Sequence, residues 1–418
     1  MRKDLKIRDG KPGGIGWFIW HFGCFIGRVL FNKRLNVQFE NWELMKTMNP
    51  PFLLVGNHVT NFDPVIISSN QKHHIHWVAN DAVFRHPFVR WAMLHTQTIP
   101  KTKGMSDLDS VRIIHKKIRE GGVVAVYPEG QTSWDGLNQP LIPATPKLIK
   151  LLKVPVLAVI IKGGYMTQPR WVWTKNLRRS RIILEAKILF TKEEIKQLSV
   201  EELGERLQSG IFHDDFQFQK ENPVLLESSK RAESLELFTY LCPKCNTLDA
   251  LKSEGNSVEC QSCHWTFSID EYGEFPADDN FPFQSLSQWN HWQQDQTVRM
   301  VREYRTLLRP EKPLLSNENL TILTGIGLVP LKPLCQGDLQ LWQDRLEFVP
   351  FKGEPMIFPL GEIEAVSIFK QQKLEFYHEK VLYRFHFATP RDSAYKWLEF
   401  LKEITLPISK GKAAAEAD

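Results

Sequence analysis

Cysteine is scarce in this sequence, with six residues among 418. So few cysteines argue against a disulfide framework. Four of the six form two Cys-x-x-Cys pairs with 14 residues between them, and paired knuckles of this kind are typical of tetrahedral zinc sites. We therefore predict a structural zinc ribbon over residues 238–270, in a reducing compartment, with the ligands Cys242, Cys245, Cys260 and Cys263. Redox-active thiols are the alternative.

The N-terminal region also lacks an apolar run of transmembrane length. The segment from Pro12 to Gly27 carries no formal charge and is rich in Trp, Phe and Ile, but a spanning helix needs about 20 apolar residues. We predict that residues 1–34 form a peripheral or monotopic anchor on the cytoplasmic face of the membrane, with Trp17 and Trp20 at headgroup level. An aromatic helix that docks on its own domain is the alternative. A secretory signal would need a small-residue cleavage site after the apolar run.

Net positive charge comes from the N-terminus. The formal net charge of the chain is +5, and the first 40 residues account for it with eight basic against three acidic side chains. Basic side chains that flank an apolar segment suit a membrane surface with anionic lipid. Because the remainder is about neutral and no basic stripe surrounds the cysteine pairs, we expect no nucleic-acid partner.

Short β-rich runs alternate with helical stretches from residue 35 to residue 225, and the sequence contains no internal repeats. This alternation predicts an α/β domain, in which functional groups gather where strands end. Apolar residues at helical spacing predict helices at 105–122 and 143–153. The expected strands are residues 52–58, 75–80, 123–130, 154–161 and 181–190.

The pattern changes beyond the cysteine pairs. A linking helix is expected within residues 284–310, and strand-like runs then occupy residues 315–406 and close with an amphipathic helix at 393–404. This β-rich segment resembles a pleckstrin-homology (PH) or GRAM-like domain. Residues 407–418 are predicted to be a disordered tail.

The segment GNHVTNFDP at 56–64 places a histidine at the end of an apolar strand and an aspartate at the start of a helix. Aspartate suits the capping of free amides, and Pro64 suits the first helical position. Such a turn lets the carboxylate of Asp63 accept a hydrogen bond from one nitrogen of His58, so that the other nitrogen can take a proton near neutral pH. His58 and Asp63 are thus candidates for a general base and its orienting group. An aspartate that merely ties down a turn is the alternative.

A second strand end, VYPEGQTSWDG at 126–136, supplies a glutamate and a glycine. Together the two segments resemble the glycerolipid acyltransferase family, the PlsC-type lysophosphatidate acyltransferases, over about residues 35–190. The family block NHxxxxD is matched by Asn57, His58 and Asp63, and a [FY]PEG block is matched by residues 127–130. The apolar strand at 154–161, with its internal proline, matches a further block. The resemblance implies a glycerolipid-acyltransferase-like αβ domain within residues 35–225.

The resemblance also implies an O-acyltransferase of phospholipid biosynthesis that turns 1-acylglycerol 3-phosphate, a lysophospholipid, into phosphatidate. In this reaction His58 deprotonates the acceptor hydroxyl, which attacks the thioester of acyl-CoA or acyl carrier protein directly. Glu129 and the backbone at Gly130 shape the acceptor site. Asn57 and Thr132 are further candidates for contact with the substrate. The sequence contains no G-x-S-x-G motif that would point to a covalent acyl-enzyme.

Two positions depart from the family pattern. The [FY]PEG block usually continues with an arginine two residues after the glycine, where this chain has Thr132. The second family block usually ends on an arginine, for which Lys101 or Lys103 would stand in, and lysine binds phosphate as a point charge rather than a fork. We expect compensation from the basic segment 162–181, unless it is only a solvated face. Its candidate phosphate ligands are Arg170, Arg178 and Arg179.

Two other functions stay open from the sequence. The first is an acyltransferase for another lysophospholipid, glycerol 3-phosphate or a different hydroxylated amphiphile, because Thr132 leaves the acceptor undetermined. The second is a non-catalytic lipid or nucleic-acid adaptor that binds through the zinc ribbon and the C-terminal β domain. This adaptor would function normally with His58→Ala.

Overall fold

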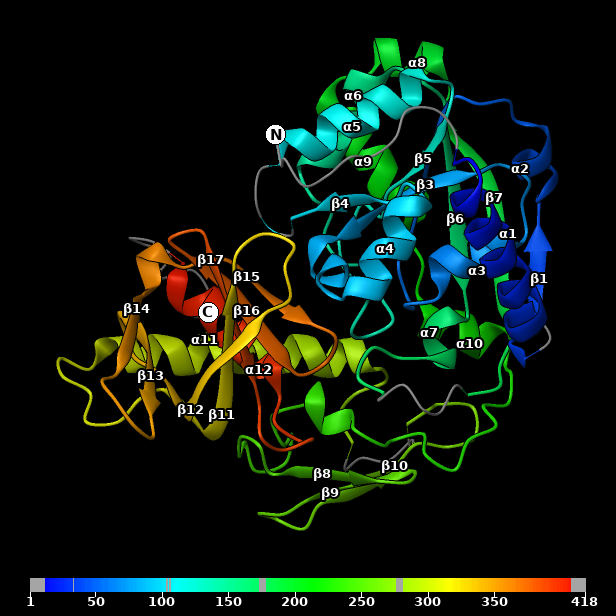
Figure 1. Ribbon diagram of the computed structural model, residues 1–418. Helices are drawn as coiled ribbons and strands as arrows, with labels where there is room; N and C mark the ends of the chain where they lie inside the picture. Colours follow the sequence, from blue (N-terminus) through cyan, green and yellow to red (C-terminus); the bar gives the residue numbers. More distant parts are fainter. Residues whose placement is uncertain are drawn as a thin grey trace. The chain divides into compact units, whose positions relative to one another are not determined.

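The computed structural model describes residues 12–32, 34–102, 104, 107–172, 178–275 and 281–406. The predicted basic N-terminus before residue 12, Lys103 and the predicted tail at 407–418 lie outside these residues. The described chain divides into two compact units (Figure 1). The first contains the residues up to Asn290 together with Gly327–Pro330, and the second contains the rest.

A seven-stranded sheet forms the centre of the first unit (Figure 1). Its order is β1-β7-β6-β2-β5-β3-β4, and all neighbouring strands are parallel except β6 and β7. The central strand β2 pairs through Leu54 with Ala125 of β5 and with Leu157 of β6. The α/β prediction for this part of the chain is confirmed. The strands are β1 (Val37–Glu40), β2 (Phe52–Gly56), β3 (Ile75–Asn80), β4 (Ile99–Lys101), β5 (Val123–Ala125), β6 (Val156–Lys162) and β7 (Ile182–Phe190).

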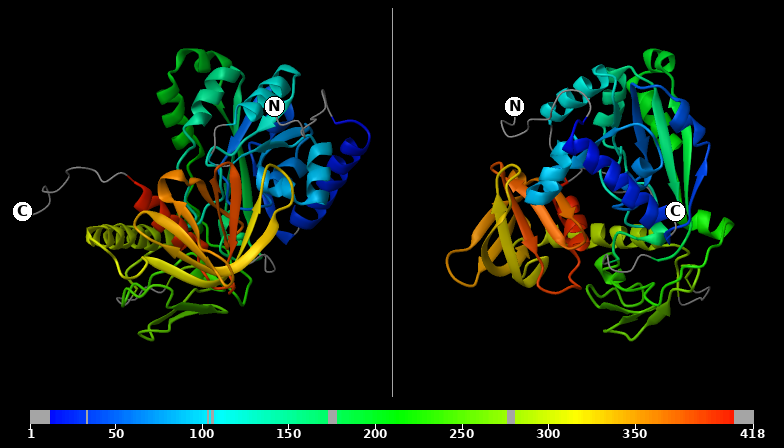
Figure 2. Two further views of the ribbon diagram at one scale, coloured as in Figure 1. Left: turned by 60° about the vertical axis from the view of Figure 1, so that its left-hand side comes forward. Right: turned by 45° about the vertical axis from the view of Figure 1, so that its right-hand side comes forward.

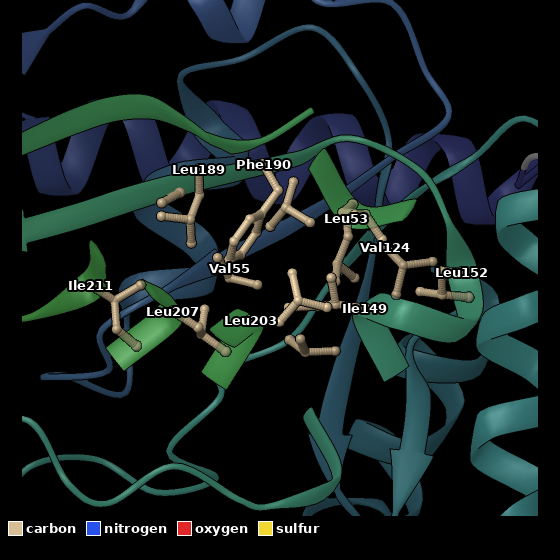
Figure 3. Close-up of a cluster of buried hydrophobic side chains, with 14 of the residues drawn as sticks. Leu53, Val55, Val124, Ile149, Leu152, Leu189, Phe190, Leu203, Leu207 and Ile211 are labelled. Atoms are coloured by element: carbon tan, nitrogen blue, oxygen red, sulfur yellow. The ribbon is translucent and has the colours of Figure 1, made fainter. Parts of the chain in front are cut away.

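The central strands are buried on both faces, which explains their nearly continuous apolar sequences. Every residue of β2 is buried. On one face of the sheet, Ile149 of α6 (Ala144–Leu152) and Leu203 of α9 (Val200–Ile211) belong to one apolar cluster with Leu53 (Figure 3). Full burial of each such side chain stabilises the fold by about 1.5–3 kcal/mol. This core therefore fixes the strand ends from which the polar segments leave.

The helix expected at 105–122 is shorter and spans Leu108–Arg119 (α5). The side chain of Asp107 accepts the amide of Ser110 and caps the helix start, and Gly121 follows its end with a φ of 79°. The helix expected at 143–153 is α6. The other helical elements of the first unit are α1 (Ile15–Gly27), the π-helical η1 (Arg28–Asn32), α2 (Glu43–Thr47), α3 (Asp63–Ser69), η2 (Asp81–Arg85), α4 (Pro87–His95), α7 (Gly164–Thr167), α8 (Lys192–Gln197), α10 (Asp215–Glu221) and η3 (Leu235–Leu237).

Helix α1 packs on α3 and α4 through its glycines. Gly16 and Gly27 are the buried residues of this helix. A Cβ atom on Gly16 would collide with the carbonyl oxygen of His95 in α4, and one on Gly27 would collide with Ser69 in α3. Most of its large apolar side chains lie on the outside, where Trp17, Phe18, Phe22 and Phe25 are exposed. Trp20 is half-buried instead, with its ring 4.4 Å from that of His74. Among the described residues, no helix combines the length and the hydropathy needed to cross a bilayer.

A small antiparallel sheet lies in the region of the cysteine pairs (Figure 2). Cys242 and Cys245 precede its first strand, Cys260 ends its second, and Cys263 follows. The sheet consists of β8 (Leu251–Glu254), β9 (Ser257–Cys260) and β10 (Thr266–Ser268), in the order β10-β9-β8. Beside it, the ring of Trp289 lies 5.5 Å from that of Phe267 and 5.6 Å from that of Phe281, and its Nε1 donates to the carbonyl of Leu241 at 3.3 Å. Trp289 belongs to α11 (Leu286–Thr306), so aromatic packing joins this sheet to the start of α11.

The second unit contains a seven-stranded sheet of order β14-β13-β12-β11-β17-β16-β15, in which all neighbours are antiparallel. The helix expected at 393–404 is α12 (Ala394–Thr405), and Ser393 caps it by accepting the amide of Lys396. The β-rich character expected of this region is confirmed. Its other elements are β11 (Leu315–Gly325), β12 (Lys332–Leu341), β13 (Arg345–Pro350), β14 (Met356–Pro359), η4 (Leu360–Glu362), β15 (Glu364–Phe369), β16 (Lys373–His378) and β17 (Val381–His386).

Candidate active site

The two polar segments meet where β2 and β5 end. These strands are parallel neighbours, so the residues that follow them emerge at the same edge of the sheet. The amide of His58 donates to Glu129 Oε1 at 3.2 Å, and the carbonyl of His58 accepts the amide of Ser133 at 2.9 Å. The strand expected at 123–130 ends at Ala125, because Tyr127 to Gly130 turn away from the sheet to make these contacts.

His58 and Asp63 form a hydrogen-bonded pair. His58 Nδ1 lies 2.8 Å from Asp63 Oδ2, and the two side chains are 17% and 1% exposed. Since a carboxylate accepts, Nδ1 carries the proton and Nε2 keeps its lone pair. Within the described residues, Nδ1 of His58 has a hydrogen-bond partner and Nε2 has none. A partly exposed imidazole with a free basic nitrogen can accept a proton from a bound alcohol.

The carboxylate of Asp63 does not cap helix α3, which corrects the sequence-based expectation. The helix begins at Asp63 itself, with Phe62 at the N-cap position and no capping side chain. The carboxylate instead accepts the amides of Val59 and Thr60, each at 2.9 Å, and the hydroxyl of Thr60 at 2.5 Å. Side chains at a helix start lean toward the N-terminus, so this carboxylate reaches the preceding turn rather than the helix amides. Pro64 occupies the first turn, as expected.

Asn57 holds two strands together. Its Nδ2 donates to the carbonyl of Ile161 at 2.9 Å, and its Oδ1 accepts the amide of Ile161 at 2.7 Å. The side chain is buried and thus continues the pairing of β2 with β6 beyond the last strand residue. Its polar atoms face the backbone of β6, so Asn57 fixes the start of the His58 turn. Both polar groups of its side chain are used in these bonds, so Asn57 has a structural role rather than contact with substrate.

Glu129 lies behind the base in a buried position. Its carboxylate accepts the amides of His58 at 3.2 Å and Gln139 at 2.6 Å and the side-chain amide of Asn138 at 2.8 Å. Burial raises the pKa of Glu129 to about 8, against the opposing effect of these three donors. Gly130 follows with a φ of 67°, and a Cβ atom there would collide with Ile142, so this turn requires glycine. Asn138 and Gln139 belong to no motif and were not predicted.

Of the three candidate arginines, Arg170 lies at the loop that follows Gly130. Its Nη1 donates to the carbonyl of Thr132 at 3.0 Å and to Gln131 Oε1 at 3.4 Å. The guanidinium also lies over the ring of Trp134, 4.2 Å from its centroid. The guanidinium of Arg170 therefore lies next to the backbone of Thr132, the position at which the family pattern has an arginine.

The other predicted cations are placed differently. Arg178 is buried and donates to the carbonyls of Met166 and Arg231, and burial lowers its pKa to about 10. Its guanidinium thus supports the chain rather than a ligand. Arg179 is exposed and pairs with Glu227 at 3.3 Å. Lys101 lies on the edge strand β4, where its Nζ donates to the carbonyl of Thr102 at 2.9 Å.

A second histidine–aspartate pair lies in the same unit and was not predicted. His213 Nε2 lies 2.7 Å from Asp215 Oδ1, and this carboxylate also accepts the amides of Gly163 and Tyr165 at the start of α7. The two residues are two positions apart and belong to no motif, so sequence spacing gave no signal. The carboxylate of Asp215 anchors the start of the short helix α7. This structural pair therefore serves as a control for the proposed catalytic pair His58 and Asp63.

The four cysteines predicted as metal ligands come together. Their Sγ atoms all lie within 4.8 Å of one another. Cys242 and Cys263 are 3.9 Å apart, and Cys245 and Cys260 are 3.7 Å apart. Tetrahedral zinc with Zn–S bonds of about 2.3 Å requires sulfur separations of about 3.8 Å, so this group could hold zinc. All four coordination positions would then be filled by protein, which fits a structural ion.

Comparison with known proteins adds one family match that covers both polar segments. Residues 34–162 match the family model described as Acyltransferase. The matched segment contains His58, Asp63 and Glu129, so the two polar segments lie within a region that matches an acyltransferase family. A similar solved structure is the 1-acyl-sn-glycerophosphate (LPA) acyltransferase PlsC from Thermotoga maritima, with 21% identity, a TM-score of 0.41, and coverage of 50% of this chain and 80% of that chain. No curated protein matches the chain.

Proposed function

We propose that this protein is an O-acyltransferase that moves a fatty acyl group from acyl-CoA or acyl carrier protein to the free hydroxyl of 1-acylglycerol 3-phosphate, giving phosphatidate. The observation that carries the proposal is the His58–Asp63 pair, bonded through the His58 backbone to Glu129 inside a domain of the acyltransferase family. An oriented imidazole with a free nitrogen is what direct transfer to an alcohol requires.

In the proposed mechanism, Nε2 of His58 takes the proton from the acceptor hydroxyl as the oxygen attacks the thioester carbon. The carbon–oxygen bond forms, the carbon–sulfur bond breaks, and the thiolate leaves with its electron pair. The imidazolium then returns the proton to the sulfur. Asp63 keeps Nδ1 protonated throughout and stabilises the imidazolium. Base catalysis of this kind contributes about 10² to 10⁴ in rate, and the positioning of both substrates contributes further.

Arg170 is the proposed ligand for the phosphate of the acceptor. A guanidinium can bind two phosphate oxygens at once, which a lysine cannot. The contact of Arg170 with Thr132 supports this assignment, because Thr132 belongs to the loop that also carries Glu129 and Gly130. Thr132 and its neighbours would line the same part of the acceptor site. An acceptor without phosphate is the competing proposal, and it requires no role for Arg170.

We further propose that the protein works on the cytoplasmic membrane surface, where a lysophospholipid is found. Helix α1 presents Trp17, Phe18, Phe22 and Phe25 to the outside and contains no charged residue. Helix α4, which contacts the start of α1, adds Phe88 and Trp91 with exposures of 69% and 44%. Aromatic side chains on a short apolar helix suit the interfacial region of a bilayer.

Zinc is proposed as a structural ion in the cysteine group, without a step in acyl transfer. A zinc ion at this position would couple metal binding to the folding of the small sheet β8–β10. The second unit is proposed to be a PH- or GRAM-like module, which its antiparallel strands and closing helix α12 support.

The decisive experiment compares His58→Ala with His213→Ala. Purified protein is given acyl-CoA or acyl carrier protein with 1-acylglycerol 3-phosphate, other lysophospholipids or glycerol 3-phosphate in parallel. We expect His58→Ala to lose at least about 100-fold in turnover, and His213→Ala, which removes an imidazole from an equally short pair, to stay within about threefold of wild type. Wild-type turnover by His58→Ala would refute the role of His58 as the base. Absence of turnover by the wild-type protein with every acceptor would favour a non-catalytic adaptor.

A further inference from the structure

The imidazole of His58 lies flat against the phenol ring of Tyr127. The two ring centroids are 3.9 Å apart, and the ring planes differ by 4°. The ring of Tyr127 also stacks on Trp77, at 5.4 Å and 23°, and Trp77 Nε1 donates to Ser68 Oγ at 2.9 Å. Because β5 lies between β2 and β3, Tyr127 is the middle ring of a three-ring stack.

The hydroxyl of Tyr127 does not account for its position. The oxygen is buried, and it has no hydrogen-bond partner among the described residues. Burial raises the pKa of Tyr127 well above its ordinary value, and the carboxylates of Asp63 and Glu129 add to this effect. The phenol is therefore protonated near neutral pH. Its ring is the part that touches the base.

We propose that Tyr127 is a positioning residue that holds the ring plane of His58 and stabilises the imidazolium formed during acyl transfer; this inference rests on the proposed role of His58. Asp63 binds one edge of the imidazole, at Nδ1, and that bond alone leaves the ring free to tilt. A parallel ring at 3.9 Å blocks the tilt. The electron-rich face of a phenol also attracts a cation, so the stack favours the protonated imidazole.

The kinetic test compares Tyr127→Leu, which removes the ring, with Tyr127→Phe, which removes only the hydroxyl. Because cation–π contacts at desolvated sites reach about 1–2 kcal/mol, we expect kcat of the leucine variant to fall by about 5- to 30-fold. The acceptor KM should not change, and the acidic limb of the kcat–pH profile should move to lower pH. The phenylalanine variant should match wild type within about twofold. Equal kcat in the leucine variant, or an equal loss in the phenylalanine variant, would overturn the proposal.

A second measurement reports the stack without using activity. In protein labelled with ¹³C at the histidine ring carbons, the His58 signal is assigned by its absence in His58→Gln. A ring stacked on a tyrosine has proton resonances shifted upfield, so we expect the shift to persist in Tyr127→Phe and to disappear in Tyr127→Leu. Tyr127→Met replaces the leucine variant if that variant lacks a cooperative melting transition. A protein without acyl transfer to any acceptor would end the proposed function, whereas an unchanged His58 signal in the ring-less variant would end only this inference.

Discussion

Asp63 allows the role of the carboxylate in catalysis to be separated from its role in the turn. Oδ2 accepts three hydrogen bonds, from His58 Nδ1 and from the amides of Val59 and Thr60, whereas Oδ1 accepts only the hydroxyl of Thr60. In Asp63→Asn, the amide oxygen should therefore take the place of Oδ2. The new NH₂ group then faces the hydroxyl of Thr60, which can accept a hydrogen bond as well as donate one. Orientation of His58 is kept, and only the negative charge is lost.

The magnitude follows from the difference between a charged and a neutral acceptor. Hydrogen bonds to charged groups contribute about 1.5–3 kcal/mol and neutral ones about 0.5–1.5 kcal/mol. The hydrogen bond to residue 63 therefore stabilises the imidazolium by about 1–2 kcal/mol less in the asparagine variant. We expect kcat of Asp63→Asn to fall by about 5- to 30-fold. Asp63→Ala removes the acceptor altogether and leaves two buried amides unpaired, at about 1–3 kcal/mol each. This variant should lose about 10² to 10⁴ in kcat and melt at a clearly lower temperature.

The assay measures kcat of both variants with saturating acyl-CoA and acceptor, alongside thermal melting followed by circular dichroism. A folded Asp63→Asn protein that is as inactive as Asp63→Ala would refute the argument, because it would mean that the amide turns its NH₂ group toward Nδ1. Asp63→Asn with full activity would show that the charge contributes nothing to the base.

Three further outcomes are expected. Because burial raises the pKa of Glu129 from 4.5 to about 8, the folded protein holds a proton that the unfolded chain releases between these two pH values. The free energy of unfolding in urea should therefore decline as the pH rises from 4.5 to about 8, and Glu129→Gln should remove this dependence on pH. Arg170→Ala should raise KM for a phosphate-bearing acceptor by about 10- to 100-fold, whereas Arg179→Ala, at an exposed ion pair, should change it less than twofold; equal effects would contradict the assignment. Removal of zinc by a chelator should abolish hydrogen-exchange protection in β8–β10 while the central sheet stays protected, and loss of protection in both would show that the ribbon supports the whole unit.

The elements with strong local signals were predictable from the sequence. Unbroken apolar runs indicated the buried strands of the central sheet, and polar segments after two of them brought His58 and Glu129 to one edge. Paired knuckles indicated a four-cysteine group. In each case the signal is local, because strand burial and ligand spacing are properties of a few neighbouring residues.

The rest depends on contacts that local patterns do not encode. The sequence gives no indication that Arg178 is enclosed by backbone carbonyls while Arg170, eight residues earlier, reaches the loop at Thr132. Likewise, the bond of Asn57 to Ile161 spans 104 positions. The direction of the Asp63 carboxylate was also missed, because a helix-start aspartate has two sets of amides within reach and only the tertiary turn decides between them.

Helix α1 packs two buried glycines and the half-buried Trp20 against the rest of the first unit, and most of its large apolar side chains stay exposed. Glycine contacts at Gly16 and Gly27 allow a close approach but remove little hydrocarbon from water. In buffer without detergent, the aromatic side of this helix is exposed to water. Self-association of the protein, or binding of detergent, would bury this apolar surface and is therefore favourable. Purification should consequently yield large particles that shrink to a uniform hydrodynamic radius once micelles are supplied.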